Sequence, residues 1–269
     1  MSKAKARPDS RYKLLSPYFA ALFLAFIWAG PLSVLAQSVR IKEYNDLGWF
    51  TYNGTYGLGK SKFALHTEAQ FRRVDFGSKP EQLLLRIGLN YKANSALTLQ
   101  AGYCFVETYP YGEYPINRFG KIFPEHRTFQ SAIYVDDRFR VIVTHRARLE
   151  QRWLAKYDSA KSDKPDSWLY TNRIRYMLRL QCPLQGPTLD DKEFYLAAID
   201  ELFINFGKNV GENVFDQNRI LALLGFRINP HIRLEAGYIS QILELGRRID
   251  SKNVFQHNSG LSVNAVVNF

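Results

Sequence analysis

The stretch THRARLEQRW, residues 144–153, alternates charged and apolar side chains with a period of two. One set of alternate positions carries Arg146, Arg148, Glu150 and Arg152, and the other carries Ala147, Leu149 and Trp153. Successive side chains of a β-strand point to opposite faces. The stretch therefore predicts a strand with one charged and one apolar face, and the fold depends on which face meets water.

The same alternation recurs along most of the chain. In KFALHTEAQFR, residues 62–72, one face carries Phe63, Leu65, Thr67, Ala69 and Phe71. A soluble β-sandwich would also alternate, but the predicted strands reach about ten residues or more, the length that a tilted membrane strand needs. A strongly charged face suits the interior of a membrane barrel whose apolar face meets lipid. The sequence predicts an all-β fold, a transmembrane antiparallel up-and-down β-barrel.

The alternation defines eleven strands, beginning with residues 49–56. Single-chain bacterial barrels usually have an even number, so we expect about twelve, with a short first strand within residues 39–44; ten is the alternative. Long and short connections alternate, as outer loops and periplasmic turns do. The last strand ends at Phe269, which resembles the assembly signal of outer-membrane barrels and predicts contact with the barrel-assembly machinery.

The N-terminus has the pattern of an export signal. A basic segment, residues 1–13, precedes the apolar run LLSPYFAALFLAFIWAG and the tripeptide Val34-Leu35-Ala36. We expect a signal peptide over residues 1–36 that is cleaved after Ala36, although one uncleaved transmembrane helix is the alternative. An N-terminal segment or short first strand over residues 37–45 and a barrel domain over residues 46–269 would follow.

The chain is basic, with a formal net charge of +11. Such a balance suits nucleic acid or anionic lipid, but export argues against a nucleic-acid partner. We expect the bacterial outer membrane as the location and its lipid as the surroundings, and the oligomeric state stays open. Cys104 and Cys182 lie near opposite ends of their predicted strands, so no disulfide is expected.

An ordered set of segments resembles a known family. These segments are KFALHTEAQFR, EHRTFQSA, HRARLEQRW, TNRIRYMLRL, IDELFINF and FDQNRILALLGFRINPHIRLEAGYISQ, followed by the terminal Phe269. Together they are similar to the bacterial domain of unknown function (DUF) 2490 family, over nearly the whole chain after the leader. No single motif is specific, but their order is. The resemblance implies a Gram-negative outer-membrane β-barrel and no characterised activity.

Charged residues on the predicted inner face are the first candidates for a functional site. They are Glu68, Arg72, Arg86, Arg140, Arg146, Arg148, Glu150, Arg152, Arg173, Arg175, Arg179, Glu201, Arg219, Arg227, Arg233 and Glu235. Rings of arginine favour anions in a pore, which predicts a narrow porin-like channel. In a small barrel the same side chains can instead interlock as ion pairs and fill the interior, which predicts a plugged structural or binding barrel.

His257 and Ser259 provide an alternative function. Their spacing puts both on one face of a strand, the face that continues into apolar residues. A histidine that activates a serine makes a hydrolytic nucleophile, and lipid A deacylases and phospholipases of the outer membrane resemble this placement. Gly260 follows the serine where those enzymes carry asparagine, and no acid that would orient His257 is evident. We expect a polar strand end and no enzymatic activity, with a lipid hydrolase as the alternative.

Metal and cofactor sites are not expected. His66 and Glu68 share the inner face, but the neighbouring Arg72 suits a salt-bridged network better than a cation site. No glycine-rich phosphate loop, zinc-ligand spacing or nucleophile elbow occurs in the sequence.

Overall fold

The computed structural model describes residues 40–211 and 213–269, and this part of the chain folds into strands joined by loops and turns. The expected leader, residues 1–36, lies outside the described residues. No helix that is long and apolar enough to cross a membrane occurs in the described ranges.

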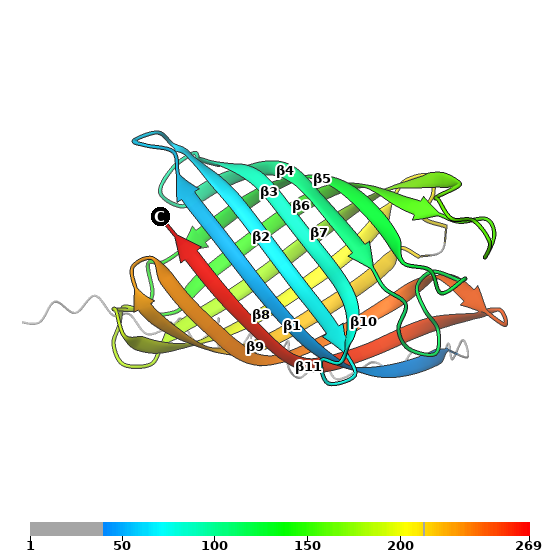
Figure 1. Cartoon of the computed structure of the whole chain (residues 1–269). Coiled ribbons are helices and arrows are strands. Elements are labelled where there is room, and N and C mark those ends of the chain that lie inside the picture. The colour runs from blue at the N-terminus through cyan, green and yellow to red at the C-terminus, as the bar shows by residue number, and fades with distance from the viewer. Residues whose placement is uncertain (1–39, 212) are drawn as a thin grey trace, which may run out of the picture. The chain divides into compact units, whose positions relative to one another are not determined.

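Eleven strands form one closed barrel in the described chain (Figure 1). They are β1 (Ile41–Gly57), β2 (Phe63–Val74), β3 (Lys79–Lys92), β4 (Leu97–Thr108), β5 (Phe123–Asp136), β6 (Ile142–Lys156), β7 (Ser167–Pro183), β8 (Glu193–Phe206), β9 (Phe215–Asn229), β10 (Ile232–Ile249) and β11 (Lys252–Asn268). Each strand from β2 to β10 pairs antiparallel with its two neighbours in sequence. The predicted all-β barrel is confirmed.

The strand count is one fewer than twelve because the expected short first strand is not separate. Residues 41–44 continue directly into residues 49–56 as the single strand β1, whose alternate residues Glu43, Leu47 and Trp49 are all buried. An odd number of strands makes the first and last run in the same direction. The barrel therefore closes through a parallel pair, in which Ile41 of β1 lies opposite Val254 of β11 and Thr55 opposite Asn268.

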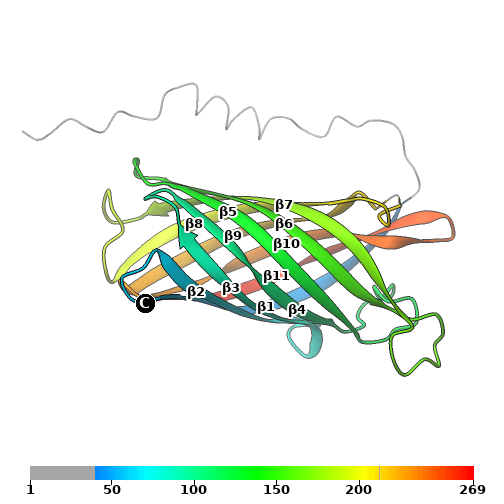
Figure 2. The ribbon, with the colours of Figure 1, turned by 90° about the horizontal axis from the view of Figure 1, so that it is seen from above.

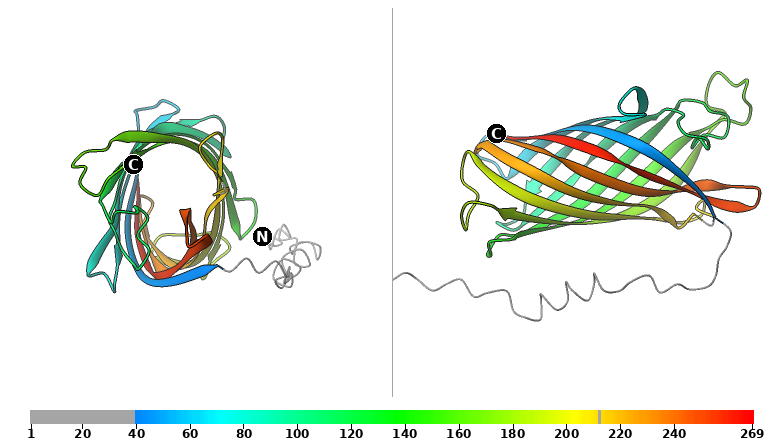
Figure 3. Two further views of the ribbon diagram at one scale, coloured as in Figure 1. Left: turned by 90° about the vertical axis from the view of Figure 1, so that its right-hand side faces the viewer. Right: turned by 90° about the horizontal axis from the view of Figure 1, so that it is seen from below.

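The connections alternate between the two ends of the barrel. Residues 75–78, 109–122, 157–166, 207–211 with 213–214, and 250–251 form the loop end, and residues 58–62, 93–96, 137–141, 184–192 and 230–231 form the turn end. The connections after β2 and β10 have only four and two residues, so the expected alternation of long and short connections holds only in part. The C-terminus lies at the turn end (Figure 1), and the tilt of the strands between the two ends is plain in Figure 2. Seen along its axis, the barrel is a complete ring of strands (Figure 3).

The outer surface is apolar and carries aromatic residues toward both ends. Phe63, Tyr91, Phe194 and Phe269 are exposed near the turn end, and Phe71, Trp168, Tyr170 and Phe206 near the loop end. Between them lie exposed aliphatic side chains such as Leu85, Ile87 and Leu224. A water-soluble protein rarely exposes so continuous an apolar belt.

Three polar side chains interrupt the outer surface without distorting the strands. His126 and His145 lie outward and contact tyrosines, His126 Nδ1 with Tyr103 Oη at 2.5 Å and His145 Nδ1 with Tyr176 Oη at 2.7 Å. Asp200 is also exposed and accepts a hydrogen bond of 2.7 Å from Asn218 Nδ2. The register is continuous at all three, so these side chains face outward without a β-bulge.

Candidate functional site

Most of the predicted inner charges are buried inside the barrel. Fewer than one tenth of the surface is exposed for Glu68, Arg72, Arg86, Arg148, Glu150, Arg152, Arg173, Arg175, Glu201, Arg219 and Glu235. Arg146, Arg179, Arg227 and Arg233 are half-buried. Arg140 was wrongly placed, because β6 begins only at Ile142 and Arg140 is exposed in the turn before it, where it donates to the carbonyl of Pro183.

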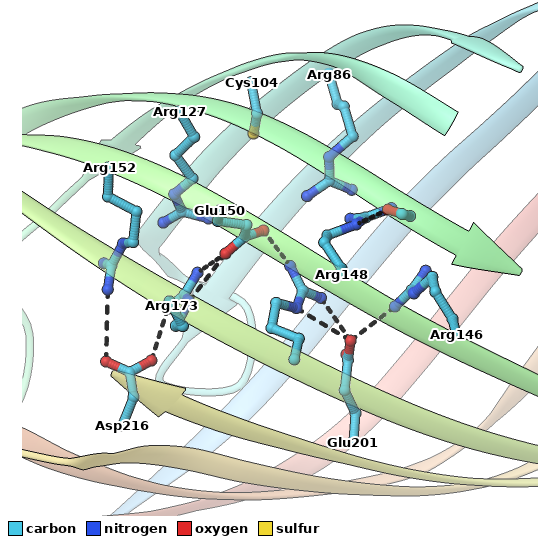
Figure 4. A network of polar contacts seen from close by, with 12 residues as sticks. Arg86, Cys104, Arg127, Arg146, Arg148, Glu150, Arg152, Arg173, Glu201 and Asp216 are labelled. Atoms are coloured by element: carbon cyan, nitrogen blue, oxygen red, sulfur yellow. Dashed lines mark hydrogen bonds and ion pairs between the residues drawn. The ribbon is translucent and has the colours of Figure 1, made fainter. Parts of the chain in front are cut away.

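A continuous chain of ion pairs crosses the interior from β8 to β7 and β6. Glu201 on β8 accepts hydrogen bonds from Arg146 Nη2 at 2.7 Å and from Arg175 Nη2 at 2.8 Å. Arg175 also donates from Nη1 to Glu150 at 2.7 Å. The guanidinium of Arg175 therefore joins the carboxylates of Glu201 and Glu150. Glu150 also accepts a hydrogen bond of 2.5 Å from Arg173 (Figure 4).

The chain continues toward the loop end. Arg173 Nη1 donates to Asp216 on β9 at 2.6 Å, and Arg152 Nη1 lies 3.6 Å from the other oxygen of Asp216 (Figure 4). Arg152 also donates to Glu125 at 2.5 Å, and so does Arg127 from the same strand as Glu125. Five strands, β5 to β9, are therefore connected by one ionic lattice of four carboxylates and five arginines.

Two inward aromatic rings support guanidinium groups beside the lattice. Phe203 lies under Arg175 at 4.4 Å from the ring centre, and Phe129 lies under Arg148 at 4.6 Å. Such cation–π contacts stabilise a desolvated cation by about 2 kcal/mol or more. Arg148 has no carboxylate partner among the described residues, and it donates instead to Ser131 Oγ at 2.8 Å and to Gln100 Oε1 at 2.9 Å.

Glycines on neighbouring strands make room for these rings. A Cβ atom on Gly102 would lie 2.9 Å from the Phe129 ring, and one on Gly88 would lie 3.2 Å from it. Tyr195, which donates to Glu235 at 2.7 Å, covers Gly225 in the same way. The middle of the barrel is therefore closely packed, because an open water-filled passage would leave Arg148 and Glu150 far more than 2% and 1% exposed.

The loop end, in contrast, encloses a cavity of about 410 Å³. Its lower wall consists of inward side chains that include Arg72 and Arg219. Its upper wall comes from the loops after β4 and β8 and from β10, and consists of Tyr111, Ile116, Asn117, Arg118, Asn209, Val210, Asn213 and Arg247. We call this cavity the vestibule. It lies above the ionic lattice, because Arg152, Arg173 and Asp216 form part of its lining.

The loop of residues 109–122 folds into the mouth of the barrel. Its Tyr111 is only 6% exposed and packs among Leu47, Trp49 and Ile239 on the inner wall. The hydroxyl of Tyr111 donates to Gln256 Oε1 at 2.9 Å, and burial raises the pKa of this tyrosine well above its ordinary value. The sequence did not reveal whether this loop turns inward or outward.

Sequence reasoning missed four residues of the interior. Glu125 and Arg127 are two positions apart and share a face, which is the alternation found elsewhere, but His126 between them made both faces seem charged. Asp216 is the second residue of β9, three positions before Arg219, and a register shift in the β8–β9 pairing takes it out of the period of two. Tyr111 carries no sequence signal, because its burial depends on where the loop lies.

His257 and Ser259 lie on the outer face of β11, as their spacing predicts. The ring of His257 stacks on Tyr44 at 5.3 Å, and no hydrogen bond joins it to Ser259. In the parallel pair Ser259 lies opposite Asp46, but no contact connects this carboxylate to His257. The pair thus lacks the hydrogen bond by which a histidine activates a serine.

The two cysteines and the pair His66 and Glu68 were the other groups considered for a disulfide or a metal site. Cys104 is buried inside the barrel and Cys182 lies on β7, and both are free thiols. His66 Nε2 lies 3.6 Å from Glu68, whose carboxylate is also paired with Arg86. No group of three potential metal-ligating side chains occurs in the described part of the chain.

The chain also matches a known protein family. Residues 47–252 match the family described as "Protein of unknown function (DUF2490)". The chain belongs to the DUF2490 family. No curated protein and no solved structure matches it. The DUF2490 match extends from the middle of β1 to the start of β11, so it includes the ionic lattice and the inward loop.

Proposed function

We propose that this DUF2490 protein is a closed binding barrel of the bacterial outer membrane. The observation that carries the proposal is the ionic lattice, which fills the interior with paired and nearly inaccessible side chains. A porin keeps a hydrated path past its charged residues. Here the arginines are engaged with carboxylates and aromatic rings instead.

The outer surface supports the membrane location. Its apolar belt and the aromatic residues toward both ends match the lipid-facing surface and interfacial girdles of outer-membrane barrels. A signal peptide over residues 1–36 and recognition of Phe269 by the assembly machinery would deliver the chain there. The backbone N–H of Phe269 donates to the carbonyl of Thr55 at 2.8 Å, and its carbonyl accepts from Gly57 N at 2.6 Å, so Phe269 also extends the pairing of β11 with β1.

Planar-bilayer recording of the folded full chain tests the closed interior. We expect no discrete conductance from wild type, because no hydrated path passes the lattice. The double variant Arg148→Ala, Arg175→Ala removes two interior side chains and should admit ions, while Arg138→Ala at an exposed turn should stay silent. Stepwise currents from wild type, with insertion verified by heat-modifiable gel mobility, would contradict a closed barrel.

A lipid hydrolase receives no support from the placement of His257 and Ser259, because neither contacts the other. Assay of fatty-acid release from phospholipid vesicles covers this alternative. Release that His257→Ala abolishes, with the fold retained, would replace the binding role by an enzymatic one.

A further inference from the structure

The vestibule carries more positive charge than its surroundings neutralise. Ten basic and four acidic residues line it. The lattice occupies several of these arginines, but Arg72 and Arg219 have no ion-pair partner among the described residues. Arg72 donates to the amide oxygens of Gln70 at 2.6 Å and Gln82 at 2.6 Å, and Arg219 donates to Gln217 at 3.0 Å.

The two arginines converge on one aromatic ring. The guanidinium carbon of Arg72 lies 4.0 Å from the centre of the Trp49 ring, and that of Arg219 lies 4.8 Å from it. Both arginines are at least nine-tenths buried. The buried Glu81, which accepts a hydrogen bond of 2.8 Å from Trp49 Nε1, is a carboxylate near both arginines. One carboxylate cannot neutralise two guanidinium groups, and an excess positive charge in a poorly solvated site is costly unless a further anion joins it.

Polar atoms without partners line the same cavity. They are Thr171 Oγ1, Asn213 Oδ1 and Arg247 Nε, each buried and without a hydrogen bond. Buried polar atoms in native proteins are almost always hydrogen-bonded. The set combines a hydroxyl, an amide acceptor and a charged donor, which suits a ligand that offers hydroxyl groups as well as negative charge.

The shape of the cavity restricts the ligand further. A volume of about 410 Å³ lies within the range of small-molecule sites and exceeds what a single inorganic anion fills. Tyr111, Phe123 and Tyr157 add aromatic surface to the lining. The site lies inside the barrel wall and under a loop, so a lipid-anchored head group cannot enter through the wall.

The inward loop covers this site and is held from both sides. Arg247 donates to the carbonyl of Pro115 at 2.7 Å, and Gln256 donates to that of Tyr114 at 3.1 Å. On the other side Lys121 donates to the carbonyl of Ser162 at 2.5 Å. The cover keeps Arg72 and Arg219 away from bulk water, which strengthens their attraction for an anion.

We infer that the vestibule binds a soluble anionic sugar, meaning a sugar that carries a phosphate or carboxylate group. Arg72 and Arg219 would hold the anionic group above Trp49, and the unpaired hydroxyl and amide atoms would accept or donate to the sugar hydroxyls. This inference rests on the proposed function, in which the interior is closed below the vestibule and the barrel binds rather than conducts.

Calorimetric titration of the folded full chain in detergent with glucose 6-phosphate tests the inference. We expect saturable binding that weakens with added salt and falls at least tenfold in Arg72→Gln and in Arg219→Gln. Arg227→Gln is the matched control, because this arginine pairs with Asp191 near the turn end and should bind like wild type. Arg72→Lys keeps the charge and should retain part of the affinity, which separates loss of charge from loss of fold.

Glucose and inorganic phosphate are the comparison ligands. Both should bind at least tenfold more weakly than glucose 6-phosphate. Equal affinity for inorganic phosphate would overturn the sugar assignment, and absence of saturable glucose 6-phosphate binding would overturn the inference as a whole. If glucose 6-phosphate does not bind but the bilayer recording shows no conductance, only the sugar inference fails. If the recording shows conductance, the proposed function fails, so the two failures are distinguishable.

Discussion

The lattice and the vestibule use the same residue type in opposite ways. In the lattice, Arg173 and Arg175 each contact two carboxylates, so charge is neutralised within the wall. In the vestibule, Arg72 and Arg219 donate to amide oxygens and lie over aromatic rings, and neither forms an ion pair with a described carboxylate. The difference teaches that arginine content alone does not define a pore. The available partners decide whether an inner arginine supports the structure or awaits a ligand.

The largest effect is expected from breaking the lattice at its centre. Glu150→Gln leaves Arg173 and Arg175 without one of their carboxylates, and removal of one partner from a buried ion pair costs about 3–5 kcal/mol. Urea titration of the folded protein in detergent measures the free energy of unfolding. A loss below about 1 kcal/mol, the range of surface pairs, would mean that the lattice does not stabilise the barrel.

A smaller effect is expected from overpacking the interior. A Cβ on Gly225 would overlap the Tyr195 ring, so Gly225→Leu would force the new side chain against that ring, and such insertions cost about 1–3 kcal/mol. The same urea titration detects the loss. Gly120→Leu changes only a loop position where nothing lies near the added atoms, although its φ of +64° adds backbone strain, so the double variant Gly225→Leu, Tyr195→Ala is the better control. It should recover part of the stability, and no recovery would mean that the glycine does not accommodate the ring.

The inward loop should respond to alkaline pH through Tyr111. Burial raises the pKa of Tyr111, so its contribution to stability is fully present below pH of about 10 and is lost as pH rises toward the raised value. Tyr111→Phe removes the hydrogen bond to Gln256, at a cost of about 1 kcal/mol at neutral pH. Between neutral and strongly alkaline pH, wild type should lose more unfolding free energy than Tyr111→Phe. Equal losses would show that Tyr111 does not ionise on release.

The smallest effect on stability is expected in the vestibule. Arg219→Gln removes a buried charge that has no carboxylate partner, so the lost hydrogen bond is offset by the lower cost of desolvation and the change stays within about 1 kcal/mol. Binding of glucose 6-phosphate should nevertheless fall. A loss of stability as large as that of Glu150→Gln would remove the distinction between the two regions.

The sequence was sufficient to predict the barrel and most of its inward-facing residues, because the alternation of side chains is a property of each strand and does not depend on the strands beside it. It placed Arg148, Glu150 and Arg173 on one face without knowledge of the fold. It did not supply their partners, since pairing across strands depends on register and closure. The joining of Arg173 to Asp216 across 43 residues, and the entry of Tyr111 into the mouth, arise only when the chain closes.

The parallel pairing of β1 with β11 could not be predicted from the sequence either. The even-number expectation required a twelfth strand within residues 39–44, whereas residues 45–48, which separated it from the next expected strand, continue β1. Period-two patterns do not reveal where one long strand replaces two short ones. The parity of the barrel, and hence the direction of its closing pair, depends on that single boundary.

Cys104 offers the most direct measurement of the closed interior. It is an inner residue of β4 beside Arg86 and Arg127 (Figure 4). Only 1% of its surface is exposed. In Cys182→Ser it is the only thiol, and its rate of reaction with a small, charged, water-soluble methanethiosulfonate reports whether water reaches the middle of the barrel. The account predicts no reaction in the folded protein and complete reaction after unfolding. Rapid modification in the folded state would show a hydrated passage and would contradict the closed barrel.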